Sequence, residues 1–173
     1  MPLRRGAAQV RVAALSAAQN TVTLNASVNS NTQMWIGSRP NWAAYTVSVP
    51  ITLADNNGNA GVNVHIEALT NPAPNDSGAL YFAGIEAPGA GNQVVIGAEV
   101  SGWHPLTTAP GTFNPGTPYT LQVTIAGNAI SVSVDGTAYA SFTDTTYDMV
   151  YGSMDIRTYN STATYGPVTV TCN

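Results

Sequence analysis

Hydrophobic and polar residues alternate with a period of two along most of this chain, as in AYTVSVPITL at 44–53 and PYTLQVTIA at 118–126. Because successive side chains of a strand point to opposite faces, this alternation indicates strands with one buried and one polar face. No segment shows the period of an amphipathic helix. Strands are therefore predicted at 8–15, 20–28, 32–37, 44–53, 61–69, 79–86, 92–100, 118–126, 128–134, 137–143, 149–157 and 163–171. So many short strands are typical of a large all-β sandwich.

Two dipeptides mark tight turns in the second half of the chain. Gly127-Asn128 and Asp135-Gly136 each separate two alternating runs, and two-residue hairpin turns need residues that accept positive φ. Residues 118–143 are therefore predicted to form a three-stranded meander. Side chains predicted to face the core in this meander and in the later strand 149–157 include Val123, Ile125, Ile130, Val132, Met154 and Ile156.

Surface loops are predicted where Gly, Pro, Asn and Thr gather, at 54–60, 70–78, 87–91 and 101–117. Pro72 and Pro74 are incompatible with a central strand in the second of these segments. Neither a linker nor an internal repeat interrupts the pattern. We therefore expect a basic, flexible N-terminal arm, 1–7, followed by a single β-sandwich domain, 8–173.

Composition narrows the classes of partner. Charged residues make up 8% of the chain, with five Arg and no Lys, and the net charge is −4. A nucleic-acid partner is not expected, because phosphate binding needs a positive surface. Membrane insertion is not expected either, because no run approaches the roughly 20 apolar residues of a spanning helix. Cys172 is the single cysteine, which excludes an internal disulfide bond.

The N-terminal sequence does not predict a signal peptide. Arg4 and Arg5 are followed by Ala-rich sequence, but Gln9, Arg11 and Ser16 interrupt the apolar run of roughly 7–15 residues that a signal peptide needs. We expect an extracellular or virion-surface location. Without a signal peptide, the chain would reach it as part of a larger exported protein or by another route.

The C-terminal half resembles a known family of folds. PYTLQVTIAGNAISVSVDGTAYASFTD and GSMDIRTYNSTATYGPVTV are similar to the last strands of concanavalin A-like lectin/glucanase domains. Within that superfamily the similarity is to laminin G-like modules, fructan-binding modules and 3-keto-disaccharide hydrolase-like domains. AAYTVSVPITLADNNGNAGVNV extends it back to Ala43, over roughly three quarters of the chain. The resemblance implies an all-β, two-sheet antiparallel jelly-roll sandwich, a fold that serves many ligands.

The sequence departs from the family pattern at two places. Gly166-Pro167 stands where the family often has Asp-Asn, so a carboxylate sometimes used for calcium is missing. Neither a metal nor a cofactor is therefore expected. Asp155 stands where the family often has Gly, which puts a carboxylate two residues before Arg157.

Catalysis is not expected. Glycoside hydrolysis needs two carboxylates that flank the bond to be cleaved, and the Glu-x-Asp-x-x-Glu motif of glucanases with the resembled fold is absent. Glycosidase activity stays open, because Glu67 and Asp155 could meet from different strands. Serine chemistry has no support, since His65 and His104 are the two histidines and no Gly-x-Ser-x-Gly elbow occurs.

Polar residues on two strands form the candidate ligand site. Alternation puts Asn63, His65 and Glu67 together on the face of their strand that points away from the core. This row offers too few ligands for a metal, so it either lines a binding groove or faces solvent. Asp155 and Arg157 also share one face, and they form either a solvated ion pair or donors and acceptors in the same groove.

Trp103 supplies the aromatic part of the candidate site. It lies in a segment rich in Gly and Pro, and sugar sites combine polar groups with an aromatic ring that stacks on the sugar. Trp35 and Trp42 are expected to cover the edge of the core instead. The predicted ligand-binding residues are thus Asn63, His65, Glu67, Trp103, Asp155 and Arg157.

Two functions of different classes remain. The leading one is a non-catalytic, lectin-like carbohydrate-binding module of an extracellular or surface-displayed protein, with a glycan as its partner. The alternative is a structural decoration or fibre protein of a virion, whose partners are other copies or a capsid assembly. The basic arm and the frequency of jelly rolls in capsids favour the alternative. A virion-surface protein that binds host glycans combines both.

Overall fold

The computed structural model describes residues 12–16, 20–35, 42–68 and 79–172, without the side chains of 12–16, 35, 67 and 68. The predicted arm 1–7 and the predicted loop 70–78 lie outside this description. The strands are β1 Val12–Ser16, β2 Thr21–Asn25, β3 Asn31–Trp35, β4 Ala44–Leu53, β5 Asn59–Ala68, β6 Ala79–Glu86, β7 Gln93–Val100, β8 Trp103–Pro110, β9 Pro118–Ala126, β10 Ala129–Val134, β11 Thr137–Thr143, β12 Ser153–Tyr159, β13 Thr162–Tyr165 and β14 Thr169–Cys172.

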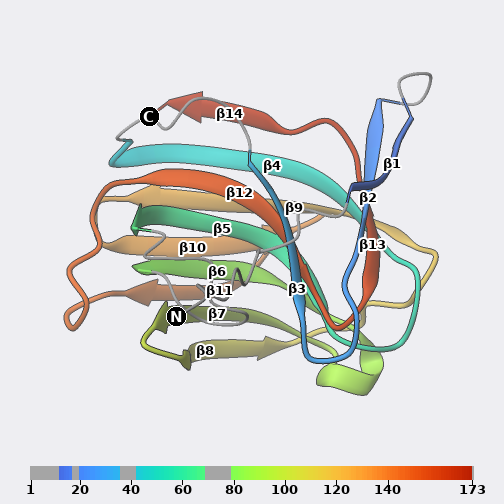
Figure 1. The fold of residues 1–173 in the computed structure, drawn as a ribbon. Helices are drawn as coiled ribbons and strands as arrows, with labels where there is room; N and C mark the ends of the chain where they lie inside the picture. The colour runs from blue at the N-terminus through green and yellow to red at the C-terminus, as the bar shows by residue number, and fades with distance from the viewer. Residues whose placement is uncertain (1–11, 17–19, 36–41, 69–78, 173) are drawn as a thin grey trace, which may run out of the picture.

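These strands form two antiparallel sheets that stack as layers (Figure 1). The larger sheet has eight strands in the order β1-β2-β13-β4-β9-β10-β11, with β14 also paired to β4. The smaller sheet has six strands in the order β3-β12-β5-β6-β7-β8. The predicted all-β sandwich is confirmed. In the described part of the chain, no helix is long and apolar enough to cross a membrane.

The core lies between the two sheets and follows the alternation of the sequence. Every second residue of β4, from Tyr45 to Leu53, is buried, and the residues between them are half-buried. The predicted core residues are all buried and belong to one hydrophobic cluster: Val123, Ile125, Ile130, Val132, Met154 and Ile156. The phase predicted for these strands is therefore confirmed, and the side chains between them lie on the outer faces of the sheets.

The predicted meander is present as β9, β10 and β11. Gly127 has a φ of +59°, and Asp135 and Gly136 have φ values of +50° and +78°. The two successive positive φ values of Asp135-Gly136 are the signature of a type I′ hairpin turn, whereas a positive φ at the first position alone, as at Gly127, occurs in a type II′ turn. The dipeptides therefore fix the order of three neighbouring strands of the larger sheet.

The predicted loop at 101–117 is wrong in its first half, because Trp103–Pro110 forms β8. Pro105 and Pro110 hid this strand, since proline cannot donate a ladder hydrogen bond and normally argues against a strand. β8 is the last strand of the smaller sheet and pairs with β7 alone. An edge strand tolerates proline because one side of its backbone needs no partner.

Two predicted strand boundaries in the C-terminal part also differ from the structure. The predicted strand 163–171 is two strands, β13 and β14, because Pro167 interrupts the ladder between them. The predicted strand 149–157 begins later, at Ser153, and the preceding Gly152 has a φ of +154°. A Cβ atom at Gly152 would lie 2.6 Å from the backbone of His65, so the close approach of two segments requires glycine there.

A tyrosine hydroxyl ties the two sheets together inside the core. Tyr165, on β13 of the larger sheet, donates a hydrogen bond to the Arg157 carbonyl oxygen at 2.5 Å. The Tyr165 hydroxyl oxygen in turn accepts hydrogen bonds from the Thr158 hydroxyl at 2.9 Å and from the Gly61 amide at 3.3 Å. Burial raises the pKa of Tyr165, so the hydroxyl keeps its proton. One buried side chain thus holds β12 and β5 against β13.

Replacing Tyr165 with Phe is expected to lower the free energy of unfolding by roughly 1–3 kcal/mol, because buried polar groups of β12 and β5 lose a partner. Urea unfolding measures this change. Tyr119→Phe is the matched control, since the Tyr119 hydroxyl accepts one exposed bond, from the Asn114 amide at 2.9 Å. Equal shifts of the unfolding midpoint in the two variants would show that the Tyr165 hydrogen bonds between the sheets contribute no more to stability than the exposed bond of Tyr119.

Candidate functional site

Four polar residues gather on the outer face of the smaller sheet. Asp155 on β12 pairs in register with Asn63 on β5. Arg157, also on β12, reaches Glu99 on β7, and their side chains form an ion pair with Nη2 and Oε1 2.8 Å apart. We call Asn63, Glu99, Asp155 and Arg157 the charged cluster. All four are buried, with exposed fractions between 0% and 3%.

Arg157 contacts both polar and aromatic side chains. Its Nε donates a hydrogen bond to the Asn31 Oδ1 atom at 3.0 Å. Its guanidinium carbon lies 4.6 Å from the centre of the Phe82 ring, 5.6 Å from that of Tyr159 and 5.8 Å from that of Trp103. Attraction between a cation and aromatic faces is strongest where water is excluded. The guanidinium therefore lies among three rings and between two polar partners.

Glycines on the neighbouring strands leave room for the side chains of Arg157 and Trp103. Arg157 pairs in register with Gly61 of β5, which pairs in turn with Gly84 of β6. A Cβ atom at Gly97 of β7 would lie 2.2 Å from the Trp103 ring, so this ring covers a position without a side chain. Trp103 is half-buried and meets Phe82 edge to face, with ring centres 6.0 Å apart. The aromatic rings thus lie along the sheet beside the charged cluster.

The charged cluster holds hydrogen-bonding atoms that the protein does not satisfy. Both amide atoms of Asn63, both carboxylate oxygens of Asp155 and the Nη1 atom of Arg157 have no hydrogen-bond partner in the described part of the chain. Buried polar atoms in native proteins nearly always have partners, and each unsatisfied one costs about 1–3 kcal/mol. Five such atoms on neighbouring strands therefore indicate a place where an external polar molecule would gain hydrogen bonds.

Burial also changes the ionisation of the site. It raises the pKa of Asp155 well above its ordinary value of 3.8, and the charge of Arg157 and the nearby Asn63 amide offset only part of the rise. Asn63 faces Asp155 without meeting hydrogen-bond geometry. Asp155 can therefore hold a proton and donate a hydrogen bond at a pH where an exposed aspartate could only accept.

The prediction that His65 shares a face with Asn63 is wrong. The pairing of β5 with β6 shifts between Val64 and Ala68, and His65 has a φ of +48°. A bulge of this kind turns a side chain to the other face of the strand. The His65 ring lies 6.1 Å from the ring of Tyr45, a member of the core cluster.

His65 has a structural role at this bulge. Its Nδ1 lies 2.8 Å from the Met149 carbonyl oxygen, which can only accept, so Nδ1 carries the proton. Burial lowers the pKa of His65, and the bond to Met149 offsets part of this change. The imidazole is therefore a neutral part of the interior. It joins β5 to the segment that leads into β12.

The other predicted site residues have different outcomes. Asn63, Asp155, Arg157 and Trp103 do come together on one face of the sheet. Asp155 and Arg157 do not form a solvated ion pair, because both are buried and Arg157 pairs with Glu99. The backbone of Glu67 lies in β5, but its side chain is outside the described part of the chain.

Three residues that the sequence did not single out complete the site. Glu99 is the one charged residue in the apolar run of β7, and such a residue needs a partner when it is buried. That signal marked Glu99 as unusual but did not identify Arg157, which is distant in sequence. Phe82 and Asn31 carried no signal, because an aromatic or amide residue on a strand is ordinary. Within the described residues, no group of three or more His, Cys, Asp or Glu side chains could hold a metal ion.

Asp155→Asn is expected to stabilise the protein at neutral pH by roughly 1–3 kcal/mol, because it removes a buried carboxylate without a full partner. The raised pKa means that ionisation of Asp155 opposes folding, so the wild-type protein loses stability as the pH rises toward the folded pKa. The advantage of the variant is therefore absent below about pH 4 and grows above it. Melting temperatures between pH 3 and 8 test this trend. A difference that is constant across this range would contradict the assignment.

Comparison with known proteins gives the fold and not a family. No family model matches the chain, and no curated protein matches it in sequence. A carbohydrate-binding module, CBM66 from Bacillus subtilis, has a TM-score of 0.71 at 13% identity, over 86% of this chain and 85% of that one. A Bacillus subtilis protein of unknown function with a galectin-like fold has a TM-score of 0.72 at 12% identity, over 91% and 84%. The Caenorhabditis elegans galectin LEC-6 has a TM-score of 0.52 at 14% identity, over 90% and 99%. The chain therefore has the concanavalin A-like jelly-roll sandwich of galectins and of this carbohydrate-binding module.

Proposed function

We propose that this protein is a non-catalytic, lectin-like module that binds a glycan at the charged cluster. The observation that carries the proposal is the set of unsatisfied atoms on Asn63, Asp155 and Arg157, on the outer face of a sheet and beside the Trp103 ring. Sugar hydroxyls can both donate and accept, so they can satisfy an amide, a carboxyl group and a guanidinium together. An extracellular or surface-displayed location, where glycans are plentiful, is part of this proposal.

The arrangement of rings and charges supports a sugar over other polar ligands. The charged cluster combines two acidic groups with one cation, so it has no excess positive charge with which to select a phosphate. Trp103 is a half-buried aromatic ring beside the charged cluster, and sugar C–H groups pack against aromatic faces. The similar fold of a carbohydrate-binding module agrees with this chemistry.

Access to the charged cluster is the physical condition for binding. Its four residues are buried, whereas Trp103 is half-buried and the neighbouring His104 is exposed. We infer that the ligand enters beside Trp103 and that the cluster must become accessible for binding. Because opening and the exchange of water for sugar contacts both reduce the net gain, affinity is expected to be weak.

Asn63→Leu separates binding from stability. The change removes two unsatisfied polar atoms and keeps a similar volume, so the melting temperature is expected to stay the same or rise, while glycan affinity falls at least about tenfold. An array of neutral and acidic oligosaccharides identifies the ligand, and titration calorimetry measures the variant. Asn114→Leu, at an exposed position in the loop before β9, is the control and should leave both quantities unchanged.

Other outcomes identify the alternatives. Retained affinity in both Asn63→Leu and Trp103→Ala would leave a glycan-binding protein whose site is elsewhere. An array without any bound glycan, together with a stable ordered oligomer in ultracentrifugation, would favour the structural virion protein. Release of shorter fragments from the bound oligosaccharide would contradict the non-catalytic assignment and point to Asp155 and Glu99 as the acidic pair.

A further inference from the structure

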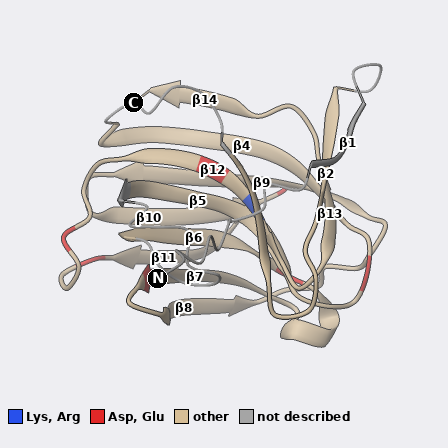
Figure 2. Cartoon of the chain, in the orientation of Figure 1, with Lys and Arg blue, Asp and Glu red and all other residues tan. Residues whose placement is uncertain are grey.

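Charge is divided unequally between the two sheets. None of the eight strands of the larger sheet contains Asp, Glu, Lys or Arg. Glu86, Glu99, Asp155 and Arg157 all lie on strands of the smaller sheet. Figure 2 shows the strands β4, β9, β10 and β11 without acidic or basic colour along their length. An ordinary solvent-facing sheet carries charges, often on its edges, to prevent association.

Hydroxyl groups take the place of charge on the outer face of the larger sheet. Pairing of the strands aligns one row of side chains across β14, β4, β9, β10 and β11, formed by Thr171, Thr46, Thr124, Ser131 and Ser141. The next row along the same strands consists of Thr169, Ser48, Gln122, Ser133 and Ala138. We call these two rows the hydroxyl face. It combines many donors and acceptors with no net charge.

Bonds between neighbouring strands hold parts of the hydroxyl face in place. The Thr46 and Thr124 hydroxyl oxygens lie 3.1 Å apart, and the Ser133 hydroxyl donates to the Gln122 side-chain oxygen at 3.2 Å. Each hydroxyl has one donor and two acceptor positions, so the Ser133 hydroxyl keeps acceptor positions after it donates to Gln122. Groups that are fixed before binding lose less entropy when a ligand arrives.

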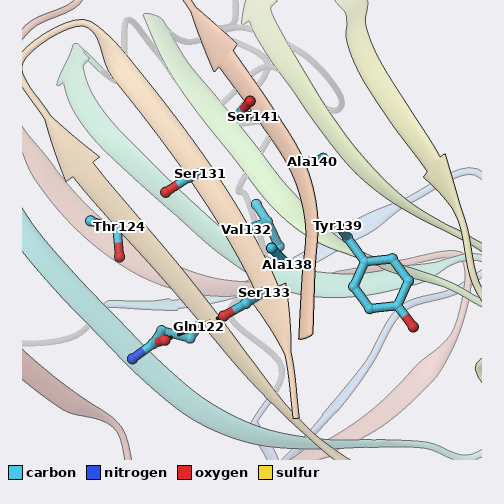
Figure 3. Close-up of a pocket in the computed structure, with 9 residues that line it drawn as sticks. All are labelled: Gln122, Thr124, Ser131, Val132, Ser133, Ala138, Tyr139, Ala140 and Ser141. Atoms are coloured by element: carbon cyan, nitrogen blue, oxygen red, sulfur yellow. Dashed lines mark hydrogen bonds between the residues drawn. The ribbon is translucent and has the colours of Figure 1, made fainter. Parts of the chain in front are cut away.

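A hollow lies over β9, β10 and β11 on this face (Figure 3). Its volume is about 230 Å³. Tyr139 of β11 is among the lining residues, but its ring packs against the core residue Phe113, with ring centres 5.8 Å apart. Polar side chains from the three strands line the rest, namely Gln122, Thr124, Ser131, Ser133 and Ser141. Pockets for drug-sized ligands usually measure about 300–1,000 Å³, so this hollow suits a single ring with its hydroxyl groups.

We propose that this hollow is a second ligand site that takes one neutral sugar residue of an uncharged polysaccharide. Its chemistry is one planar amide, from Gln122, and the hydroxyl groups of Thr124, Ser131, Ser133 and Ser141. It shares no residue with the charged cluster and lies on the opposite outer face of the sandwich, so the proposal does not rest on the first site. With both sites, one molecule can bridge two glycan chains.

The composition of the hydroxyl face disfavours other occupants. A charged surface, such as a nucleic acid or an anionic membrane, finds no opposite charge on these strands. A stable interface between two copies buries a largely apolar centre, often with aromatic or Met side chains. Tyr139 is the one aromatic side chain among the nine residues that line the hollow. A neutral polyhydroxylated ligand matches the donors and acceptors that remain.

Amide NMR spectra of the full chain test the second site. The probes are cellohexaose, xylohexaose and mannohexaose, which are neutral, and tetragalacturonate, which is acidic. At least one neutral probe is expected to shift the amides of 122–124, 131–133 and 139–141. Ser131→Trp fills the hollow with a strand-compatible side chain and should reduce this affinity at least about tenfold. Thr143→Trp, on the neighbouring edge strand β11 but outside the hollow, should not.

Each remaining outcome decides the proposal. Shifts at the hollow that persist in Asn63→Leu and vanish in Ser131→Trp support it, whatever happens at the charged cluster. No shift at the hollow with any neutral probe overturns it, and so does equal binding to Ser131→Trp. Binding of tetragalacturonate alone at the hollow also overturns it. Concentration-dependent shifts of the same amides without sugar, with a dimer in ultracentrifugation, would assign the face to a second copy. If Asn63→Leu abolishes all glycan binding and no amide at the hollow shifts in the wild-type protein, the site at the charged cluster is supported and the site at the hollow is rejected.

Discussion

A strand that is buried on both faces must pack apolar side chains on one side and find partners for polar ones on the other, and β12 is such a strand. Met154 and Ile156 enter the core, while Asp155 and Arg157 are equally buried on the outer face. A buried ion pair rarely adds net stability, but the loss of one partner is costly. Arg157 and Glu99 therefore constrain each other, and through the Tyr165 bond to the Arg157 carbonyl the same residue constrains the contact between the sheets.

The outer faces of the two sheets differ in the polar groups that they carry. The larger sheet presents hydroxyl groups and no charge, so its outer face interacts with water through many weak bonds that a ligand can replace. The smaller sheet buries Glu99, Asp155 and Arg157 away from water, where each electrostatic interaction is stronger and depends more on geometry. The outer faces of the two sheets therefore differ in their chemistry. The sandwich permits both because alternation separates the outer face of each sheet from the shared core.

The sequence predicted what depends on neighbours along the chain and missed what depends on distant pairing. β4, β6, β9 and β11 have the predicted bounds, because alternation and turn residues are local signals. The prediction of the face on which His65 lies was wrong, because a bulge in β5 breaks the alternation without any marker in the sequence. The partner of Arg157 was missed because Glu99 reaches it only after β12, β5, β6 and β7 have paired. Such contacts follow from topology, which alternation does not specify.

The unsatisfied atoms of the charged cluster are harder to explain as scaffolding than as a binding site. If Asn63 and Asp155 had a purely structural role, apolar side chains of similar volume would stabilise the fold better, because their burial carries no desolvation penalty. Proteins do retain locally unfavourable groups at functional sites, where the cost is recovered when a ligand binds. The unsatisfied atoms on Asn63, Asp155 and Arg157 lie on two paired strands, next to an aromatic ring that is half-buried. Unsatisfied atoms of the described residues also occur on Tyr45, Asn59 and His65, but those on Asn63, Asp155 and Arg157 lie together on one outer face, where we propose that a ligand supplies their partners.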